Sequence, residues 1–282
     1  MLPDQLKHCL NTFYDSGLPI TVLTGAGVSA ESGIPTFRGK EGYWQIGSTN
    51  YQPQEIGTFH MFRRQPEEVW KWYLFRRTVC HQSSPNAGHM AIVELEKIFG
   101  DRFTLITQNV DGLHLRAGNS LERSYLVHGT LEYVRCSKGC TRELFPFPDG
   151  IGDKSRETDL TEEEKRILTC PYCGDWTRPH ILWFDEYYDE DYYRFESSMK
   201  QALETGLLIT IGTSGATTLP VRVVEVVLSR EVPLIDINIA PNVFGRSAEK
   251  SGNGFFLQGS SGTILPEIVQ HISLRISDHP GT

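Results

Sequence analysis

Four of the six cysteines form two close pairs that could bind a metal ion. One pair is Cys-x-x-x-Cys and the other is Cys-x-x-Cys, and 29 residues separate them. Zinc takes four soft ligands in a tetrahedron, and two short cysteine loops supply such a set. Four thiolates leave no open position, so the spacing predicts a structural zinc site at Cys136, Cys140, Cys170 and Cys173. The alternative is redox-active disulfides. Cys9 and Cys80 are expected to be buried apolar residues.

A glycine-rich loop follows the first predicted strand. Residues 25–39 read Gly-Ala-Gly-Val-Ser-Ala-Glu-Ser-Gly-Ile-Pro-Thr-Phe-Arg-Gly. Glycines at the end of a strand let main-chain N–H groups approach a pyrophosphate. The loop departs from the usual dinucleotide fingerprint, because Ala30 stands where a third glycine is typical. From spacing alone, nucleotide binding and an ordinary tight turn are both open.

Two further segments carry polar residues that could hold a ligand or move a proton. Residues 107–114 read Thr-Gln-Asn-Val-Asp-Gly-Leu-His, and residues 127–129 read Val-His-Gly. A histidine suits proton transfer at neutral pH because its unperturbed pKa is ~6.5. Taken alone, His128 would more often be a core residue bound to a carbonyl group. Asn109 and Asp111 could likewise only cap the turn that follows a strand.

Taken together and in order, these segments resemble the sirtuin family. Three later segments also match its pattern: residues 178–186, Gly212-Thr213-Ser214 and Ile237-Asn238, so that the resemblance covers residues from about 15 to 275. It implies an NAD-dependent enzyme that removes acyl groups from protein lysine side chains. In that chemistry the acyl oxygen attacks ribose C1′ to give an alkylimidate, and a ribose hydroxyl then loses a proton and attacks the imidate. The products are nicotinamide, O-acyl-ADP-ribose and the deacylated lysine.

The resemblance also implies a role for each matched residue. The catalytic residues would be His128, as the base for the ribose hydroxyl, and Asn109, which would order the ribose or a water molecule. Phe37 would shield the nicotinamide pocket, and Arg38 would lie near the phosphates. His89 and His114 are given supporting roles. The predicted cofactor-binding set is Gly25, Ala26, Gly27, Ala30, Glu31, Thr36, Phe37, Arg38, Gln108, Asn109, Asp111, Gly212, Thr213, Ser214 and Asn238.

The helix predicted near residues 66–80 carries the clue to the acyl group. Tyr73 and Arg76 share one helix face, and an arginine beside a tyrosine hydroxyl suits a carboxylate. By spacing alone, the pattern favours a helix that packs Tyr73 on a core while Arg76 is solvated. The pair resembles the Tyr-x-x-Arg motif of sirtuins that remove succinyl, malonyl and glutaryl groups, with deacetylation as a second activity. Gly57 falls where that subgroup keeps a small residue. The predicted substrate-binding residues are Tyr73, Arg76, Gly57, Ile181, Trp183 and Phe184.

Asp185 departs from the family pattern. Sirtuins usually have glycine there, which lets the substrate peptide pair as a strand, so Asp185 is expected to change peptide affinity or sequence preference. Two other functions are alternatives to deacylation. One is mono-ADP-ribosyl transfer from the same pocket, and the other is a non-catalytic NAD-sensing or zinc-ribbon interaction module. The presence of His128, Asn109 and the Tyr73/Arg76 pair favours the deacylase.

Short β-branched runs must position these residues. Such runs lie at 20–24, 103–107, 207–211 and 233–237, and helices are expected near 3–13, 66–80, 87–98, 193–204, 219–229 and 263–275. The alternation predicts a doubly wound, Rossmann-like parallel α/β sheet. We expect a large domain from 1–39, 91–130 and 186–282. A helical insertion at 40–90 and a zinc-ribbon insertion at 131–185 would form a small domain, with the substrate lysine entering the cleft between the domains.

Composition narrows the partners. The 282 residues carry a net charge of −8, which argues against direct binding of nucleic acid or of anionic membranes. No run of 18 apolar residues occurs, and the N-terminal residues have neither a signal core nor an arginine-rich presequence. The sequence therefore predicts a cytoplasmic monomer whose partners are acyl-lysine proteins or peptides.

Overall fold

A six-stranded parallel sheet forms the centre of the larger part of the protein. The computed structural model describes residues 2–35, 44–46 and 49–278, so the predicted site residues Thr36, Phe37 and Arg38 lie outside the described residues. The strands have the order β11-β10-β9-β1-β4-β5, and all neighbours run parallel. They are β1 (Ile20–Thr24), β4 (Phe103–Thr107), β5 (Ser124–Leu126), β9 (Leu207–Ile211), β10 (Leu234–Asn238) and β11 (Phe255–Gln258).

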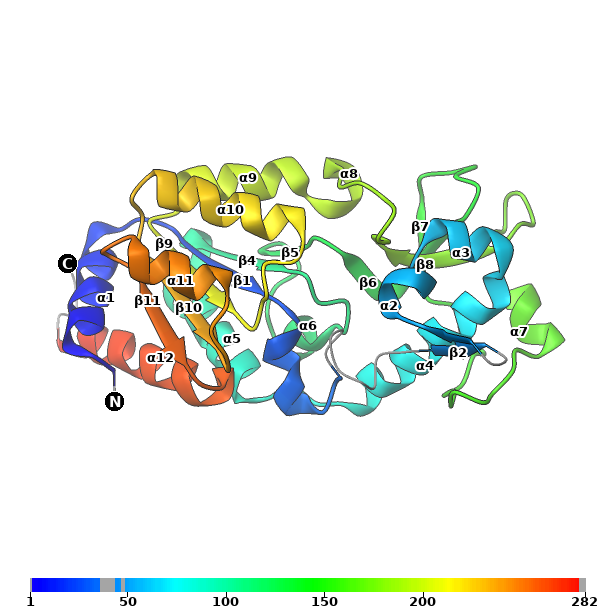
Figure 1. Cartoon of the computed structure of the whole chain (residues 1–282), viewed down its shortest axis with the longest axis horizontal. Helices are drawn as coiled ribbons and strands as arrows, with labels where there is room; N and C mark the ends of the chain where they lie inside the picture. Colours follow the sequence, from blue (N-terminus) through cyan, green and yellow to red (C-terminus); the bar gives the residue numbers. More distant parts are fainter. Residues whose placement is uncertain (1, 36–43, 47–48, 279–282) are drawn as a thin grey trace.

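Helices cover both faces of this sheet, which explains why β1, β4 and β9 are buried at every residue. One face packs against α1 (Asp4–Ser16), α5 (Ala87–Phe99) and α12 (Ser261–Asp278). The other face packs against α9 (Phe195–Glu204), α10 (Thr218–Ser229) and α11 (Val243–Lys250) (Figure 1). The predicted doubly wound α/β fold is therefore confirmed.

The chain order places a topological switch point beside β1. From β1 the chain goes to β4 and β5 on one side, and then returns to β9, β10 and β11 on the other. In open α/β sheets, ligands bind outside the carboxyl ends of the strands at such a point. We therefore expect a nucleotide site at the loops after β1 and β9. These loops include the 3₁₀ helix η1 (Ala26–Ser32).

A second group of elements lies beside the parallel sheet (Figure 1). It contains an antiparallel sheet of order β7-β6-β8 and a hairpin of β2 and β3. Its apolar cluster includes Trp70, Val134 and Leu168, and Trp70 donates a hydrogen bond to the Thr177 carbonyl at 2.9 Å. The predicted domain boundaries stay a prediction. The elements are β2 (Trp44–Ile46), β3 (Thr49–Tyr51), α2 (Pro53–Ile56), α3 (Phe59–Arg64), α4 (Pro66–Gln82), β6 (Gly129–Cys136), β7 (Leu144–Pro146), α7 (Glu162–Ile167) and β8 (Thr177–Ile181).

Three short helices complete the described chain: η2 (Gly100–Arg102), α6 (Leu113–Ala117) and α8 (Glu190–Tyr193). Within the described residues, none of the helices combines the length and apolar character needed to cross a membrane.

Candidate functional site

Two glycine loops meet at the switch point. The Gly25 amide donates to the Ile211 carbonyl and the Gly27 amide to the Gly212 carbonyl, both at 2.9 Å. A Cβ on Gly27 would lie 2.6 Å from the Gly212 Cα, so a side chain there would force the loops apart. The two amides thus satisfy carbonyls of the protein, in contrast to the predicted role as donors to a pyrophosphate. The glycines provide close contact between the loops and a wall without side chains.

The rest of the first loop is anchored to α12. The Glu31 carboxylate accepts hydrogen bonds from the Gly262 amide at 2.8 Å and from the Ser261 hydroxyl at 3.1 Å, in the first turn of that helix. Ala26 is half-buried and Ala30 is exposed. Glu31, predicted to bind the cofactor, therefore has a clear role in fixing the loop on the helix.

Ser29 joins the predicted residues that follow β4. Its hydroxyl donates to Asp111 Oδ2 at 2.7 Å and accepts from Asn109 Nδ2 at 3.1 Å. Asp111 Oδ1 accepts from the Leu113 amide at 2.9 Å, at the start of α6. All three polar side chains are buried. Sequence reasoning did not select Ser29, and its only signal was its place inside the glycine-rich loop.

Two buried histidines lie close to this cluster. The rings of His89 and His114 are 4.8 Å apart between centroids, and His89 Nε2 is 3.4 Å from the Ser29 hydroxyl. His114 Nε2 pairs with the Thr24 hydroxyl at 3.0 Å, and burial lowers the pKa of His114 to about 4. Burial also lowers the pKa of His89, to about 3, so both imidazoles are neutral at pH 7. Their position behind Ser29 agrees with a supporting role.

Gln108 connects the ends of three neighbouring strands. Its Nε2 donates to the Thr213 hydroxyl at 2.8 Å, and its Oε1 accepts from the Thr217 hydroxyl at 2.9 Å. Asn238 Nδ2 donates to the Thr213 carbonyl at 2.9 Å. The structure thus brings together the predicted residues Gln108, Thr213 and Asn238, with the exposed Ser214 next in the chain. Amide and hydroxyl groups at a switch point fit the ribose and phosphate oxygens of a dinucleotide.

His128 is held in place through its main chain. Its carbonyl accepts from the Leu182 amide at 3.0 Å, just beyond β8. Gly129 follows with a φ of +79°, and a Cβ there would lie 2.0 Å from the His180 oxygen, so only glycine fits. Loss of hydration lowers the pKa of His128 to about 4, although a hydrogen bond with the main chain of Gln108 opposes this. The imidazole is therefore neutral at pH 7, as a general base must be.

The four paired cysteines converge on one point. Their sulfur atoms all lie within 4.8 Å of one another, with Cys136 and Cys173, and likewise Cys140 and Cys170, 3.6 Å apart. Bonds of ~2.3 Å to a tetrahedral zinc ion place the sulfurs ~3.8 Å apart. A disulfide would need ~2.05 Å, and all four cysteines are free thiols. The donor set therefore fits structural zinc, as the spacing predicted.

We expect Cys170→Ala to abolish stoichiometric zinc binding. Cys170 is buried and supplies one of four ligands, so its loss opens the site and removes folding energy. A loss of ~2–3 kcal/mol would lower Tm by roughly 5–10 °C in a domain of this size. Zinc content by atomic emission and thermal unfolding measure both effects. Cys9→Ala, outside the cluster, is the control, and full retention of zinc by Cys170→Ala would refute the site.

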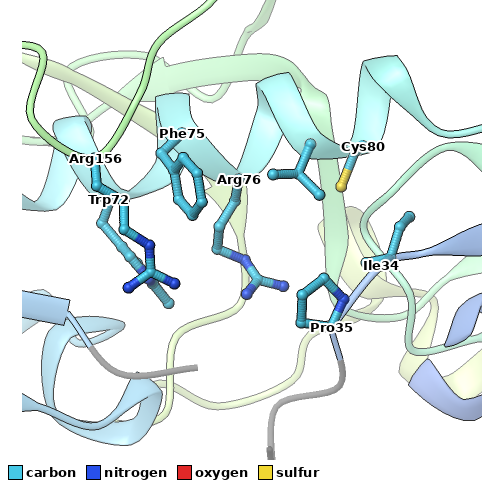
Figure 2. A pocket seen from close by; sticks show the side chains of 8 residues that line it. Ile34, Pro35, Trp72, Phe75, Arg76, Cys80 and Arg156 are labelled. Atoms are coloured by element: carbon cyan, nitrogen blue, oxygen red, sulfur yellow. The ribbon is translucent and has the colours of Figure 1, made fainter. Parts of the chain in front are cut away.

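Arg76 projects from α4 into a cavity of about 110 Å³. The Arg76 guanidinium carbon lies 5.4 Å from the Trp72 ring centroid, and that of Arg156 lies 4.9 Å from the Phe75 ring centroid. Burial lowers the pKa of Arg76, and the positive charge of Arg156 lowers it further. Figure 2 shows both guanidinium groups on the side of α4 that faces Pro35. The cavity is lined by Ile34, Pro35, Trp72, Phe75, Arg76, Val79, Cys80 and Arg156.

Tyr73 lies in the neighbouring aromatic cluster instead. Its oxygen accepts a hydrogen bond from Trp183 Nε1 at 2.8 Å, and the Arg178 guanidinium lies 3.4 Å from the Trp183 ring centroid. Burial raises the pKa of Tyr73, so the phenol keeps its hydrogen and can donate it to a further acceptor. The carboxylate fork of Tyr73 and Arg76 stays a prediction.

The predicted peptide-binding segment is bound to α2 and α3. The Phe184 amide donates to the Gly57 carbonyl at 3.0 Å, and the Asp185 carboxylate accepts from the amides of Phe59 at 2.7 Å and His60 at 3.0 Å. Asp185 therefore caps α3 within its own chain. A Cβ on Gly57 would meet the Pro53 carbonyl at 2.9 Å and the Phe184 ring at 3.3 Å. Gly57 thus permits this close contact.

The three predicted peptide contacts differ in exposure. The side chains of Ile181 and Trp183 are buried, at 6% and 2% exposure, so a peptide could reach only their main-chain atoms. Phe184 is 52% exposed and offers its ring to solvent. Peptide binding at these residues stays a prediction.

Comparison with known proteins identifies the family. The family model described as "Sir2 family" matches residues 25–218. An NAD-dependent protein deacylase of Leptospira interrogans serovar Lai is 36% identical over 95% of this chain and 98% of its own. The mitochondrial NAD-dependent protein deacylase sirtuin-5 of Canis lupus familiaris is 36% identical over 88% of this chain and 80% of its own. A solved Sir2 homologue in complex with NAD has a TM-score of 0.78 at 31% identity, covering 97% and 95% of the two chains. The chain therefore belongs to the Sir2 family, the sirtuins.

Proposed function

We propose that this sirtuin is an NAD-dependent protein-lysine deacylase that prefers acyl groups ending in a carboxylate, such as succinyl, malonyl or glutaryl. The relatives described above are named NAD-dependent protein deacylases, which supports the general reaction. Bound NAD would supply the reactive ribose carbon and nicotinamide as the leaving group. The residues of this chain would then bind NAD, orient it and accept a proton.

The polar groups at the strand ends support the NAD part of the proposal. Gln108, Thr213 and Asn238 form one connected network at the switch point, and it would orient the ribose and phosphates. Neutral His128 would accept the proton of a ribose hydroxyl at Nε2. The buried group of Ser29, Asn109 and Asp111 lies at the end of β4 and would hold the nicotinamide end.

The Arg76 cavity is the observation that carries the acyl preference. Two guanidinium groups, Arg76 and Arg156, share a small cavity whose walls include Trp72, Phe75 and Val79. Burial is the main cause of the lowered pKa of Arg76, and the like charge of Arg156 lowers it further. A carboxylate would offset the repulsion between these like charges and could form charge-assisted hydrogen bonds, whereas an acetyl group brings no charge.

The test compares initial rates on peptides that differ only in the acyl group. Nicotinamide release and deacylated peptide are both measured with succinyl-, glutaryl- and acetyl-lysine. We expect kcat/KM for the succinyl peptide to exceed that for the acetyl peptide by ~10- to 100-fold, the value of one hydrogen bond to a charged group.

Each other outcome has a distinct meaning. Equal rates, or faster deacetylation, would refute the acyl preference and leave the deacylase intact. Nicotinamide release that leaves ADP-ribose covalently attached to protein would refute deacylation and favour mono-ADP-ribosyl transfer. NAD binding without turnover of any peptide would favour the non-catalytic sensor.

A further inference from the structure

A tyrosine of this chain is bound to the proposed catalytic nitrogen. Tyr188 Oη lies 2.7 Å from His128 Nε2, and the two ring centroids are 5.8 Å apart. The tautomer of His128 that can act as the base in the proposed reaction has its lone pair on Nε2 and its hydrogen on Nδ1. In that tautomer the Tyr188 hydroxyl, 2.7 Å away, donates to Nε2.

The surroundings keep Tyr188 in position as a donor. The residue lies between the 183–186 segment and α8, and its ring packs against Phe195 at a centroid distance of 5.9 Å. Asp189 fixes the next residues by capping α8, with its Oδ1 accepting from the Tyr192 amide at 2.7 Å. Burial raises the pKa of Tyr188 to about 12, although a hydrogen bond with Thr217 opposes this. The phenol therefore keeps its hydrogen at neutral pH.

We propose that the Tyr188 hydroxyl blocks His128 Nε2 in the free protein. It occupies the hydrogen-bonding position that the substrate ribose hydroxyl must take. The inference rests on the proposed function for the identity of that competitor. A ring nitrogen has one lone pair and accepts one hydrogen bond. Tyr188 and a ribose hydroxyl therefore exclude each other at Nε2, and NAD must displace the phenol before His128 can act as the base.

The Tyr188–His128 hydrogen bond lowers the apparent affinity for NAD. Displacing the phenol breaks a hydrogen bond that the free protein already has, and a typical net value corresponds to a factor of about 5 in an equilibrium constant. Until NAD arrives, the same contact satisfies Nε2 and fixes the ring. The Tyr188 hydroxyl thus weakens NAD binding and, in the free protein, keeps the imidazole ring of His128 in one orientation.

Tyr188→Phe tests whether the hydroxyl blocks His128 Nε2, because it deletes the hydroxyl and keeps the ring packed on Phe195. NAD affinity is measured by titration calorimetry on the full chain without peptide, so the result does not depend on acyl turnover. We expect Tyr188→Phe to lower the Kd for NAD by ~3- to 10-fold. Tyr187→Phe is the matched control, since Tyr187 is 90% exposed and its variant should bind as the parent does.

A second pair of variants separates the effect of the Tyr188–His128 hydrogen bond from any general structural effect of the substitution. In a His128→Ala background, Tyr188→Phe should leave the NAD affinity unchanged, because the acceptor is gone. An unchanged or weaker affinity of Tyr188→Phe in the parent background would overturn the proposal. So would an equal gain in both backgrounds. Failure of the proposed function gives a different result, in which no acyl peptide is turned over while these binding differences persist.

Discussion

We expect His128→Ala to lower kcat for peptide deacylation by ~10³-fold, within the range of ~10²–10⁴ typical for loss of a positioned general base. His128 supplies the neutral imidazole of the switch-point site, and its main chain is fixed by Leu182 and Gly129. The substitution removes the proton acceptor and leaves the network of Gln108, Thr213 and Asn238 in place. The decisive measurement is deacylated peptide formed at saturating NAD and peptide.

His8→Ala is the control, because His8 is an exposed residue of α1. The pH profile gives an independent readout of the same group. Burial lowers the pKa of His128 to about 4, so the free enzyme holds it neutral above that pH, and protonation removes the base only as the pH falls towards 4. If His128→Ala kept kcat within threefold of the parent, the base would have to be another residue.

Arg76→Leu should reduce kcat/KM for desuccinylation by ~100-fold, the upper value for a hydrogen bond to a charged group. Deacetylation should change by less than about threefold, because an acetyl group offers no carboxylate to the guanidinium. Arg156→Leu should act in the same direction with a smaller loss, since Arg156 lies on the far side of Phe75 in the cavity (Figure 2). The same three peptides provide the measurement.

Arg77→Leu is the matched control for this prediction. Arg77 is the next residue of α4, but it pairs with Glu132 at 3.4 Å and lies over the Phe147 ring at 3.8 Å from its centroid. Its loss should affect both acyl substrates equally. If Arg76→Leu also reduced both substrates by the same factor, Arg76 would serve stability or NAD binding, and the acyl preference would need another source.

The parts of the fold that local sequence determines could be predicted. The central strands are near-continuous β-branched runs, and the cysteine pairs have ligand spacing, so β1, β4, β9 and the metal cluster were all expected. The three-residue β5 and the half-exposed edge strand β11 have no such signal. The helix α11 was also missed. It begins at the Asn242 cap inside a polar segment.

Contacts between residues far apart in the chain could not be predicted from the sequence. Ser29 meets Asn109 across 80 positions, and Tyr188 meets His128 across 60. No local pattern marks either pair, because each depends on how the strand ends and the 183–189 segment come together. Asp185 was recognised as a departure from the family, yet its partner was α3 of the same chain. A residue that departs from a family pattern can thus find its hydrogen-bond partners within its own chain.

The strand order also has a consequence for how the protein is made on the ribosome. β1 lies between β4 and β9, and β9 begins only at Leu207. The nascent chain therefore completes both cysteine pairs and the β7-β6-β8 sheet while one edge of β1 still lacks its neighbour. Since chains fold from the N-terminus as they emerge, zinc can bind before the strand ends of the proposed nucleotide site are synthesised. Thr213 and Asn238, which belong to that proposed site, are synthesised after both cysteine pairs.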